Sequence, residues 1–115
     1  MGKCPLVRNG IMTLRPVKQY VKRLADEFCP ERIILFGSLA EGRATADSDV
    51  DLMVVMDGKT NGMDRALEIR RRIPRSFPLD LIVKTPAEMR RGVQERDGFI
   101  CSVLERGKVL YEKRR

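Results

Sequence analysis

Apolar residues recur along the chain in two spacings, one typical of helices and one typical of buried strands. Four of them follow one another at intervals of four, three and four residues: Val17, Val21, Leu24 and Phe28. This spacing places them on one side of a helix over residues 13–28. Thr13 can cap that helix, and Pro30 ends it because proline cannot continue a helix.

Shorter apolar runs predict strands at residues 32–36, 50–56 and 77–84. The second run is apolar on nearly every residue after Asp51, as expected for a strand that is covered on both faces. Further helices are expected at residues 63–73, 86–93 and 97–106, and a short last strand at 108–111. The alternation predicts an α/β (α+β) fold, with helices packed on a small mixed β-sheet of three to four strands.

The chain divides into a short start and one domain. Residues 1–12 show neither the helical nor the strand spacing of apolar residues, and we interpret them as a loose N-terminal segment. Residues 13–115 are then a single domain, which is what the length of the chain allows.

The turn between the first two predicted strands gathers residues that suit phosphate and metal chemistry. Gly37 and Ser38 end the first apolar run, and Asp49 and Asp51 open the second after ten intervening residues. Positions i and i+2 of a strand point to the same face, so the two carboxylates are expected side by side. Mg²⁺ binds a few carboxylates together with substrate phosphates and waters. Glycine lets the backbone approach a phosphate closely, and the motif therefore predicts chemistry on a nucleoside triphosphate.

A third acidic residue strengthens this prediction. Asp80 interrupts the apolar run at 77–84, and an unpaired carboxylate among buried residues is costly. If its strand neighbours 50–56, Asp80 can reach the same metal ions as Asp49 and Asp51. A lone Asp-x-Asp could simply favour a turn, but the third carboxylate favours a shared site.

The roles of two further residues stay open at this point. Ser38 suits both a helix cap and a phosphate ligand, because the two use the same geometry. Arg43 is the first basic residue after the turn, and it could contact phosphate or be exposed to solvent. Two rival motifs fail on spacing. An EF-hand loop from Asp47 would carry Leu52 in place of its glycine, and a Walker A loop from Gly37 would carry Arg43 in place of its lysine.

Together these residues resemble the signature of the DNA polymerase beta-type nucleotidyltransferase superfamily: an apolar strand, Gly-Ser, about ten residues, and Asp-x-Asp. The short chain, with Gly42 after the turn and Ser48 before Asp49, is more narrowly similar to the minimal nucleotidyltransferases (MNT proteins). The resemblance covers about residues 17–112 and includes Asp80 as the third carboxylate. It implies the nucleotidyltransferase fold.

The resemblance also implies an activity. It implies that AMP from ATP is transferred to a hydroxyl group, with release of pyrophosphate. Asp49, Asp51 and Asp80 would hold two Mg²⁺ ions, with Asp80 beside the acceptor oxygen. Gly37 and Ser38 would hold the terminal phosphates, and Arg43 would be a further contact to the nucleotide.

Minimal relatives commonly act as antitoxins of HEPN-type RNase toxins, which implies a HEPN-like protein as partner and acceptor. Two alternatives stay open. The first alternative is a non-catalytic module that neutralises its partner by contact. It is suggested by Leu39 and Glu41, which stand where many relatives carry a basic residue soon after Gly-Ser. A nucleotidyltransferase acting on a small molecule is the other.

Composition narrows the choice of partners. Lys and Arg number 23 against 16 acidic residues, for a net charge of +7, which favours an acidic partner. Only 5% of the residues are aromatic and none is Trp, so a stacking platform for single-stranded nucleic acid is not expected. The absence of histidine excludes Ser-His-Asp and Cys-His catalysis and H-E-x-x-H zinc sites.

The remaining sequence features concern location and assembly. The three cysteines are far apart and form no C-x-x-C, so neither a disulfide framework nor a zinc site is expected. Buried or inert thiols in the cytoplasm are the expectation instead. No apolar stretch approaches membrane-spanning length. Because 115 residues leave little room for an acceptor domain, we expect a partner or a homo-oligomer to complete the site.

Overall fold

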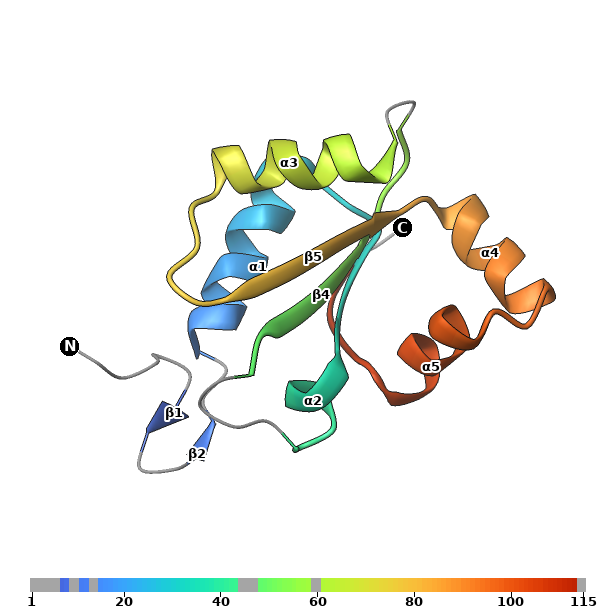
Figure 1. Ribbon diagram of the computed structural model, residues 1–115. Helices are drawn as coiled ribbons and strands as arrows, with labels where there is room; N and C mark the ends of the chain where they lie inside the picture. The colour runs from blue at the N-terminus through green and yellow to red at the C-terminus, as the bar shows by residue number, and fades with distance from the viewer. Residues whose placement is uncertain (1–6, 9–10, 13–14, 44–47, 59–60, 114–115) are drawn as a thin grey trace.

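The computed structural model describes residues 7–8, 11–12, 15–43, 48–58 and 61–113 (Figure 1). Its elements follow in the order β1 (Val7–Arg8), β2 (Ile11–Met12), α1 (Arg15–Phe28), β3 (Arg32–Phe36), α2 (Gly37–Ala40), β4 (Val50–Val55), α3 (Gly62–Arg72), β5 (Leu79–Lys84), α4 (Pro86–Gln94), α5 (Gly98–Arg106) and β6 (Lys108–Glu112). The strands and helices expected in the domain are therefore all present, with ends shifted by one or two residues.

The main sheet has four strands in the order β5-β4-β3-β6. β4 and β5 run parallel, whereas β3 is antiparallel to both β4 and β6. The sheet is thus mixed, which confirms the predicted fold class. Because the strands alternate in direction around β3, one end of the sheet collects the end of β3 and the beginnings of β4, β5 and β6.

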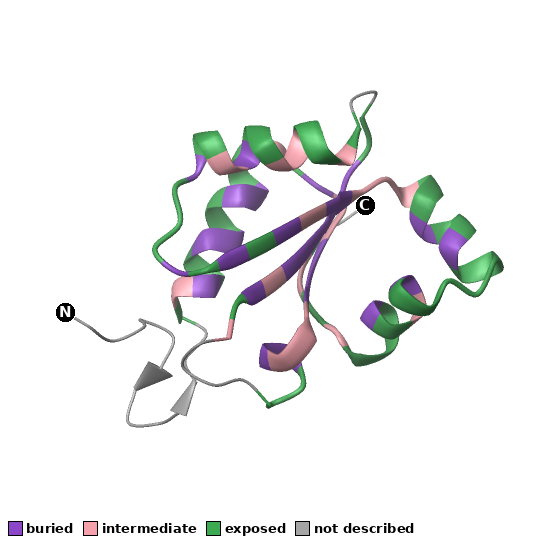
Figure 2. Ribbon diagram, in the orientation of Figure 1, coloured by how far each residue is buried: buried purple, intermediate pink, exposed green. Residues whose placement is uncertain are grey.

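Helices cover both faces of this sheet, and β4 is buried between them (Figure 2). Leu52 and Val54 belong to a core with residues of α1 and α3. Met53 and Val55 belong to a second core with residues of α4 and α5. Successive strand residues point to opposite faces, so the continuous apolar run after Asp51 is explained by two covered faces, as predicted.

Helix α1 presents the predicted apolar face to the first core. Val17 and Leu24 are fully buried and Val21 nearly so, while Phe28 is only partly buried against the same core. The helix ends at Phe28, and the following residue, Cys29, has a positive φ of 48°. The predicted cap, Thr13, lies outside the described residues.

The other helix ends show how local polar residues set the boundaries. Asn61 and Asp97 cap α3 and α5 by accepting from the backbone N–H three residues on. Thr85 and Glu88 form a capping box at the start of α4, which satisfies two backbone donors at once. Gly107 ends α5 in an extended conformation, and not in the left-handed one that favours glycine.

Both edge strands of the main sheet are irregular or covered. The register of β6 against β3 shifts between Ile33 and Ile34, which leaves Leu110 as an extra residue in the ladder. At the other edge, Arg70 of α3 donates to the carbonyl oxygen of Leu79 at 3.3 Å. Bulges and covered edges discourage pairing with other strands.

Two further features concern the N-terminal segment and the cysteines. Strands β1 and β2 pair antiparallel within the segment that we expected to be loose. Cys101 is partly buried and Cys29 is exposed, and both are free; of the expected buried or inert thiols, Cys29 is therefore not buried, and Cys4 lies outside the described residues. None of the described helices combines the length and the apolar character that crossing a bilayer requires.

Candidate active site

The three predicted carboxylates come together at the end of the sheet where β4 and β5 begin. Asp51 and Asp80 are paired in the parallel register of these two strands. Neighbouring strands lie about 4.8 Å apart, so the two residues are immediate neighbours. Asp49 is the residue just before β4. The alternation of side chains along a strand places it on the same face as Asp51.

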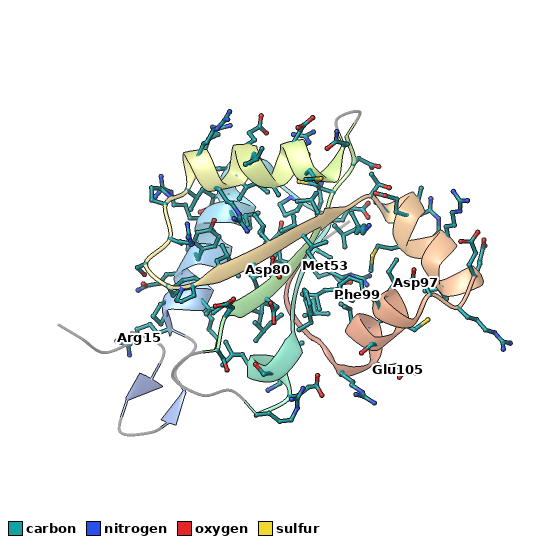
Figure 3. All side chains as sticks on the ribbon, in the orientation of Figure 1. Arg15, Met53, Asp80, Asp97, Phe99 and Glu105 are labelled. Atoms are coloured by element: carbon teal, nitrogen blue, oxygen red, sulfur yellow. The ribbon has the colours of Figure 1, made fainter. Side chains whose placement is uncertain are left out.

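These carboxylates lie on the face of the sheet that α4 and α5 cover. Asp51 alternates with Met53 and Val55, and the latter two pack in the core of that face. Asp80 alternates with Ile82, which packs against the same core; Met53, Asp80 and Phe99 of α5 are labelled in Figure 3. The two helices leave the carboxylates themselves open, since Asp49 and Asp80 are exposed and Asp51 only partly buried. The argument that Asp80 is buried, made from its apolar neighbours, is therefore wrong.

The electrostatics of the cluster show that its charges act on one another. Burial raises the pKa of the Asp51 carboxyl above its ordinary value, and the negative charges of Asp80 and Asp49 raise it further. Phe36 is the cross-strand partner of Asp51 and packs edge-to-face against Phe99, with 5.5 Å between ring centroids. The sequence motif did not indicate Phe99.

Gly37 is required at its position for two reasons. Its φ of +78° lies in the left-handed region, which side chains other than hydrogen rarely adopt. A Cβ atom there would also collide with Oδ2 of Asp51. The turn is thus packed directly against the carboxylate of β4, and the sequence prediction that these two parts of the motif meet is consistent with this contact.

Ser38 does not cap the short helix α2. The helix begins at Gly37, and its N-cap residue is Phe36, which has no side chain able to accept a hydrogen bond. The alternative that Ser38 is only a helix cap is therefore wrong. Ser38 accepts a hydrogen bond from Arg43 N through its backbone carbonyl at 2.9 Å.

The first basic residue after the turn is engaged by an acidic one. Arg43 lies 3.3 Å from Glu41, and Arg106 at the end of α5 lies 3.9 Å from the same carboxylate. The sequence prediction included Arg43 but neither Glu41 nor Arg106. The end of α5 is far away in sequence, and no pattern in the sequence indicates where it packs.

The donor set fits a hard divalent cation that is shared with a substrate. Among the described residues, no group of three Asp, Glu, Cys or His side chains converges closely enough to hold a metal by itself. Mg²⁺ does not need such a cage, since it is commonly bound through one or two carboxylates plus phosphates and waters. A partly buried carboxylate whose pKa is raised by two others is a place where a cation would relieve repulsion.

A hollow on the surface lies away from the carboxylates. A cavity of about 690 Å³ is lined by the beginning of β3, the ends of β4 and β6, and helix α4. It therefore lies at the opposite end of the sheet from the carboxylates. The candidate site is identified by its chemistry and not by the volume of a cavity.

Comparison with known proteins shows the family of the chain. Residues 14–111 match the model of the "Nucleotidyltransferase domain" family. Over 99 residues the chain is 27% identical to a protein of Methanocaldococcus jannaschii named "Putative protein adenylyltransferase". The match covers 84% of this chain and 96% of that protein.

Two solved structures share the fold. A "putative nucleotidyltransferase" from Sulfolobus solfataricus is 25% identical, with a TM-score of 0.63 over 87% of this chain and 80% of its own. A toxin–antitoxin crystal structure with AMP-PNP contains a chain that is 20% identical, with a TM-score of 0.55 over 84% of this chain and 74% of its own.

The fold, with two strands that bring carboxylates beside a Gly-Ser turn, defines a nucleotidyltransferase. The family match spans nearly the whole domain, and the chain therefore belongs to the nucleotidyltransferase domain family.

Proposed function

We propose that this protein transfers AMP from ATP to a hydroxyl group of a partner protein, with Mg²⁺ bound at Asp49, Asp51 and Asp80. The observation that carries the proposal is the meeting of three elements: Asp51 pairs with Asp80 across two parallel strands and also lies against Gly37. Carboxylates on one side and a turn without a side chain on the other are what a metal-bound triphosphate requires.

The reaction is an in-line displacement at the α-phosphorus. The acceptor oxygen forms a bond to that phosphorus, the bond to the β-phosphate oxygen breaks, and pyrophosphate leaves. Two Mg²⁺ ions, when bound, would stabilise the attacking and the leaving oxygen. Gly37 leaves room for the phosphates beside Asp51, and Ser38 lies next to it on the turn. Asp80, which is exposed on the edge strand, would receive the proton of the incoming hydroxyl.

A protein acceptor is supported by the exposure of the carboxylates and by the names of similar proteins. Asp49 and Asp80 are exposed and Asp51 is partly buried, so a hydroxyl group of another protein can approach them. One relative is named for protein adenylyltransferase activity, and one structural neighbour comes from a toxin–antitoxin structure. We therefore propose a HEPN-type RNase toxin in the cytoplasm as the partner, with this protein as its antitoxin.

Intact-mass measurement of the partner tests the proposal. The proposed partner, a HEPN-like protein, is incubated with ATP, Mg²⁺ and this protein, and the addition of AMP to it is the expected result. Asp51→Asn should abolish the mass gain, whereas Asp57→Asn, an exposed aspartate beyond the other end of β4, should preserve it. A mass gain that survives Asp49→Asn, Asp51→Asn and Asp80→Asn would show that the catalytic site lies elsewhere.

A second candidate is a binding module that neutralises the partner by contact alone. The observation in its favour is Glu41, whose carboxylate occupies the arginines nearest the turn. Inhibition of the partner without any change of its mass, in the presence of ATP and Mg²⁺, would support this candidate.

A further inference from the structure

Glu41 lies between two arginines at the exit of the Gly37–Ser38 turn. Its two carboxylate oxygens face different partners, Arg43 at 3.3 Å and Arg106 at 3.9 Å. The Glu41 side chain is 25% exposed, whereas those of the arginines are 64% and 66% exposed. Each guanidinium has five N–H donors, and most of them remain free for another anion. Exposed ion pairs of this kind add little to stability.

The backbone fixes this group to the turn. Glu41 N–H donates to the carbonyl oxygen of Gly37 at 3.1 Å, and Arg43 N–H donates to that of Ser38 at 2.9 Å. Glu41 and Arg43 therefore cannot move far from the turn without breaking it.

Arg106 approaches the same place from α5. The next residue, Gly107, packs so closely that a Cβ on it would stand 3.0 Å from the carbonyl oxygen of Leu35. Lys108 is paired with Leu35, and Phe36, the next residue of β3, is paired with Asp51. Arg106 thus belongs to the same end of the sheet as the carboxylates.

The strand order separates acidic from basic residues at this end of the sheet. Asp80 and Asp51 are the second residues of β5 and β4, whereas Arg106 comes just before β6, on the other side of β3. Arg43 shares the Glu41 carboxylate with Arg106. Adjacent strands are about 4.8 Å apart, so the beginnings of β4 and β6, which flank β3, are about 10 Å apart. An extended triphosphate whose α-phosphate lies at the carboxylates would pass Gly37 and end near the arginines.

We propose that Arg43 and Arg106 together bind the terminal phosphates of the nucleoside triphosphate, and that Glu41 is the counter-ion which this substrate displaces. The inference rests on the proposed function and specifies how its substrate is held. Arginine binds phosphate oxygens through two parallel N–H donors, and a triphosphate offers more oxygens and more charge than one carboxylate. The cation missing at position 39 is then supplied from α5.

Calorimetric titration of the whole chain with ATP and with AMP, each with Mg²⁺, tests the proposal. For Arg106→Gln the dissociation constant for ATP should rise about tenfold, since charge-assisted bonds to phosphate are lost, while that for AMP should hardly change. Arg106→Lys should restore part of the affinity. Glu41→Gln should bind ATP a few-fold more tightly than the wild type, because the competing carboxylate is gone.

Arg91→Gln is the matched control. Arg91 lies 3.1 Å from Glu95 on α4, so the substitution removes the same charge from a similar exposed pair that is not at the turn. Its affinity for ATP should equal that of the wild type. Melting temperatures of all variants show whether a change in affinity reflects unfolding; Arg106→Lys and Glu41→Gln carry the test if Arg106→Gln does not fold.

The possible results distinguish a failure of this inference from a failure of the proposed function. If the wild type binds ATP and Arg106→Gln binds it equally well, the inference is wrong and the proposed function stands. Equal losses for ATP and AMP would also overturn the inference, because the contact would not be with the terminal phosphates. If the wild type binds neither nucleotide, the proposed function fails, and the inference fails with it.

Discussion

At the scale of single residues, the chain contains two glycines whose comparison separates backbone strain from contact with the site. Gly37 and Gly42 have φ angles of +78° and +75°. A Cβ on Gly37 would collide with Asp51, whereas a Cβ on Gly42 would meet nothing within 4 Å. Alanine in the left-handed region costs about 1–2 kcal/mol, and both substitutions should lower the free energy of unfolding by about that amount.

Only Gly37→Ala should also change nucleotide binding, because its Cβ must push aside a carboxylate of the site. Denaturant unfolding and ATP titration of both variants check this prediction. If Gly37→Ala binds ATP as tightly as the wild type and Gly42→Ala do, the turn is structural and not part of the nucleotide site.

Substitution of Asp51 should lower the proposed activity without lowering the stability of the fold. Its pKa is raised by burial and by the charges of Asp80 and Asp49, so the ionised carboxylate is disfavoured in the fold. Asp51→Asn keeps the size and removes the charge. We expect the rate of AMP transfer to fall by about a hundredfold or more, while the melting temperature at pH 7 stays equal or rises. A lower melting temperature would show that the ionised carboxylate stabilises the fold.

At the scale of elements, Tyr20 joins α1 to the segment between α3 and β5. Its hydroxyl donates to the carbonyl oxygen of Ile73 at 3.2 Å, and its ring packs edge-to-face on Phe77 at 5.7 Å. Burial raises the pKa of Tyr20 above its ordinary value of 10.0, against the smaller opposing effect of nearby arginines. The proton is therefore held more tightly in the folded chain than in the unfolded one.

A raised pKa means that the stabilising contribution of Tyr20 is complete below pH 10 and is lost as the pH rises through the folded value. Tyr20→Phe removes the hydrogen bond and should cost about 1 kcal/mol at pH 7. The variant should lose less stability than the wild type between pH 9 and pH 11. Urea unfolding across this pH range measures the difference, and two parallel curves would exclude Tyr20 as the titrating group.

The elements also show which parts of the structure could be predicted from the sequence. The carboxylate cluster could be predicted. The two-residue alternation of a strand places Asp49 and Asp51 on one face, and the prediction for Asp80 needed only the assumption that β5 neighbours β4. That assumption is confirmed by the register. The exposure of Asp80 could not be predicted, since apolar neighbours along a strand indicate nothing about an uncovered end.

The contribution of α5 could not be predicted for a different physical reason. Helical periodicity predicts that a helix exists and which of its sides is apolar, but not where its ends lie in space. The place of Arg106 beside Glu41 depends on the packing of Gly107 against β3. The contact between Phe36 and Phe99 depends on the same docking. Only a long-range contact, absent from any local pattern, brings these residues to the site.

At the scale of the whole molecule, substrate binding should be visible as stability of the entire domain. A ligand that binds only the folded state stabilises it by about 2.7 kcal/mol at a concentration one hundred times its dissociation constant. For a domain of this length, that corresponds to an increase in melting temperature of roughly 10 °C. Carboxylates and phosphates bind the metal jointly in the proposed site, so ATP and Mg²⁺ together should raise the melting temperature more than the sum of either alone.

A thermal shift experiment with the partner absent checks this prediction. Addition of EDTA should remove most of the increase, and Asp51→Asn should show little of it, while Asp57→Asn should behave as the wild type. Because no acceptor is needed, the result concerns the nucleotide site alone and is independent of the identity of the partner. An increase of the same size in Asp51→Asn would place the bound nucleotide away from the carboxylates, and the cluster formed by β4 and β5 would then not be the metal site.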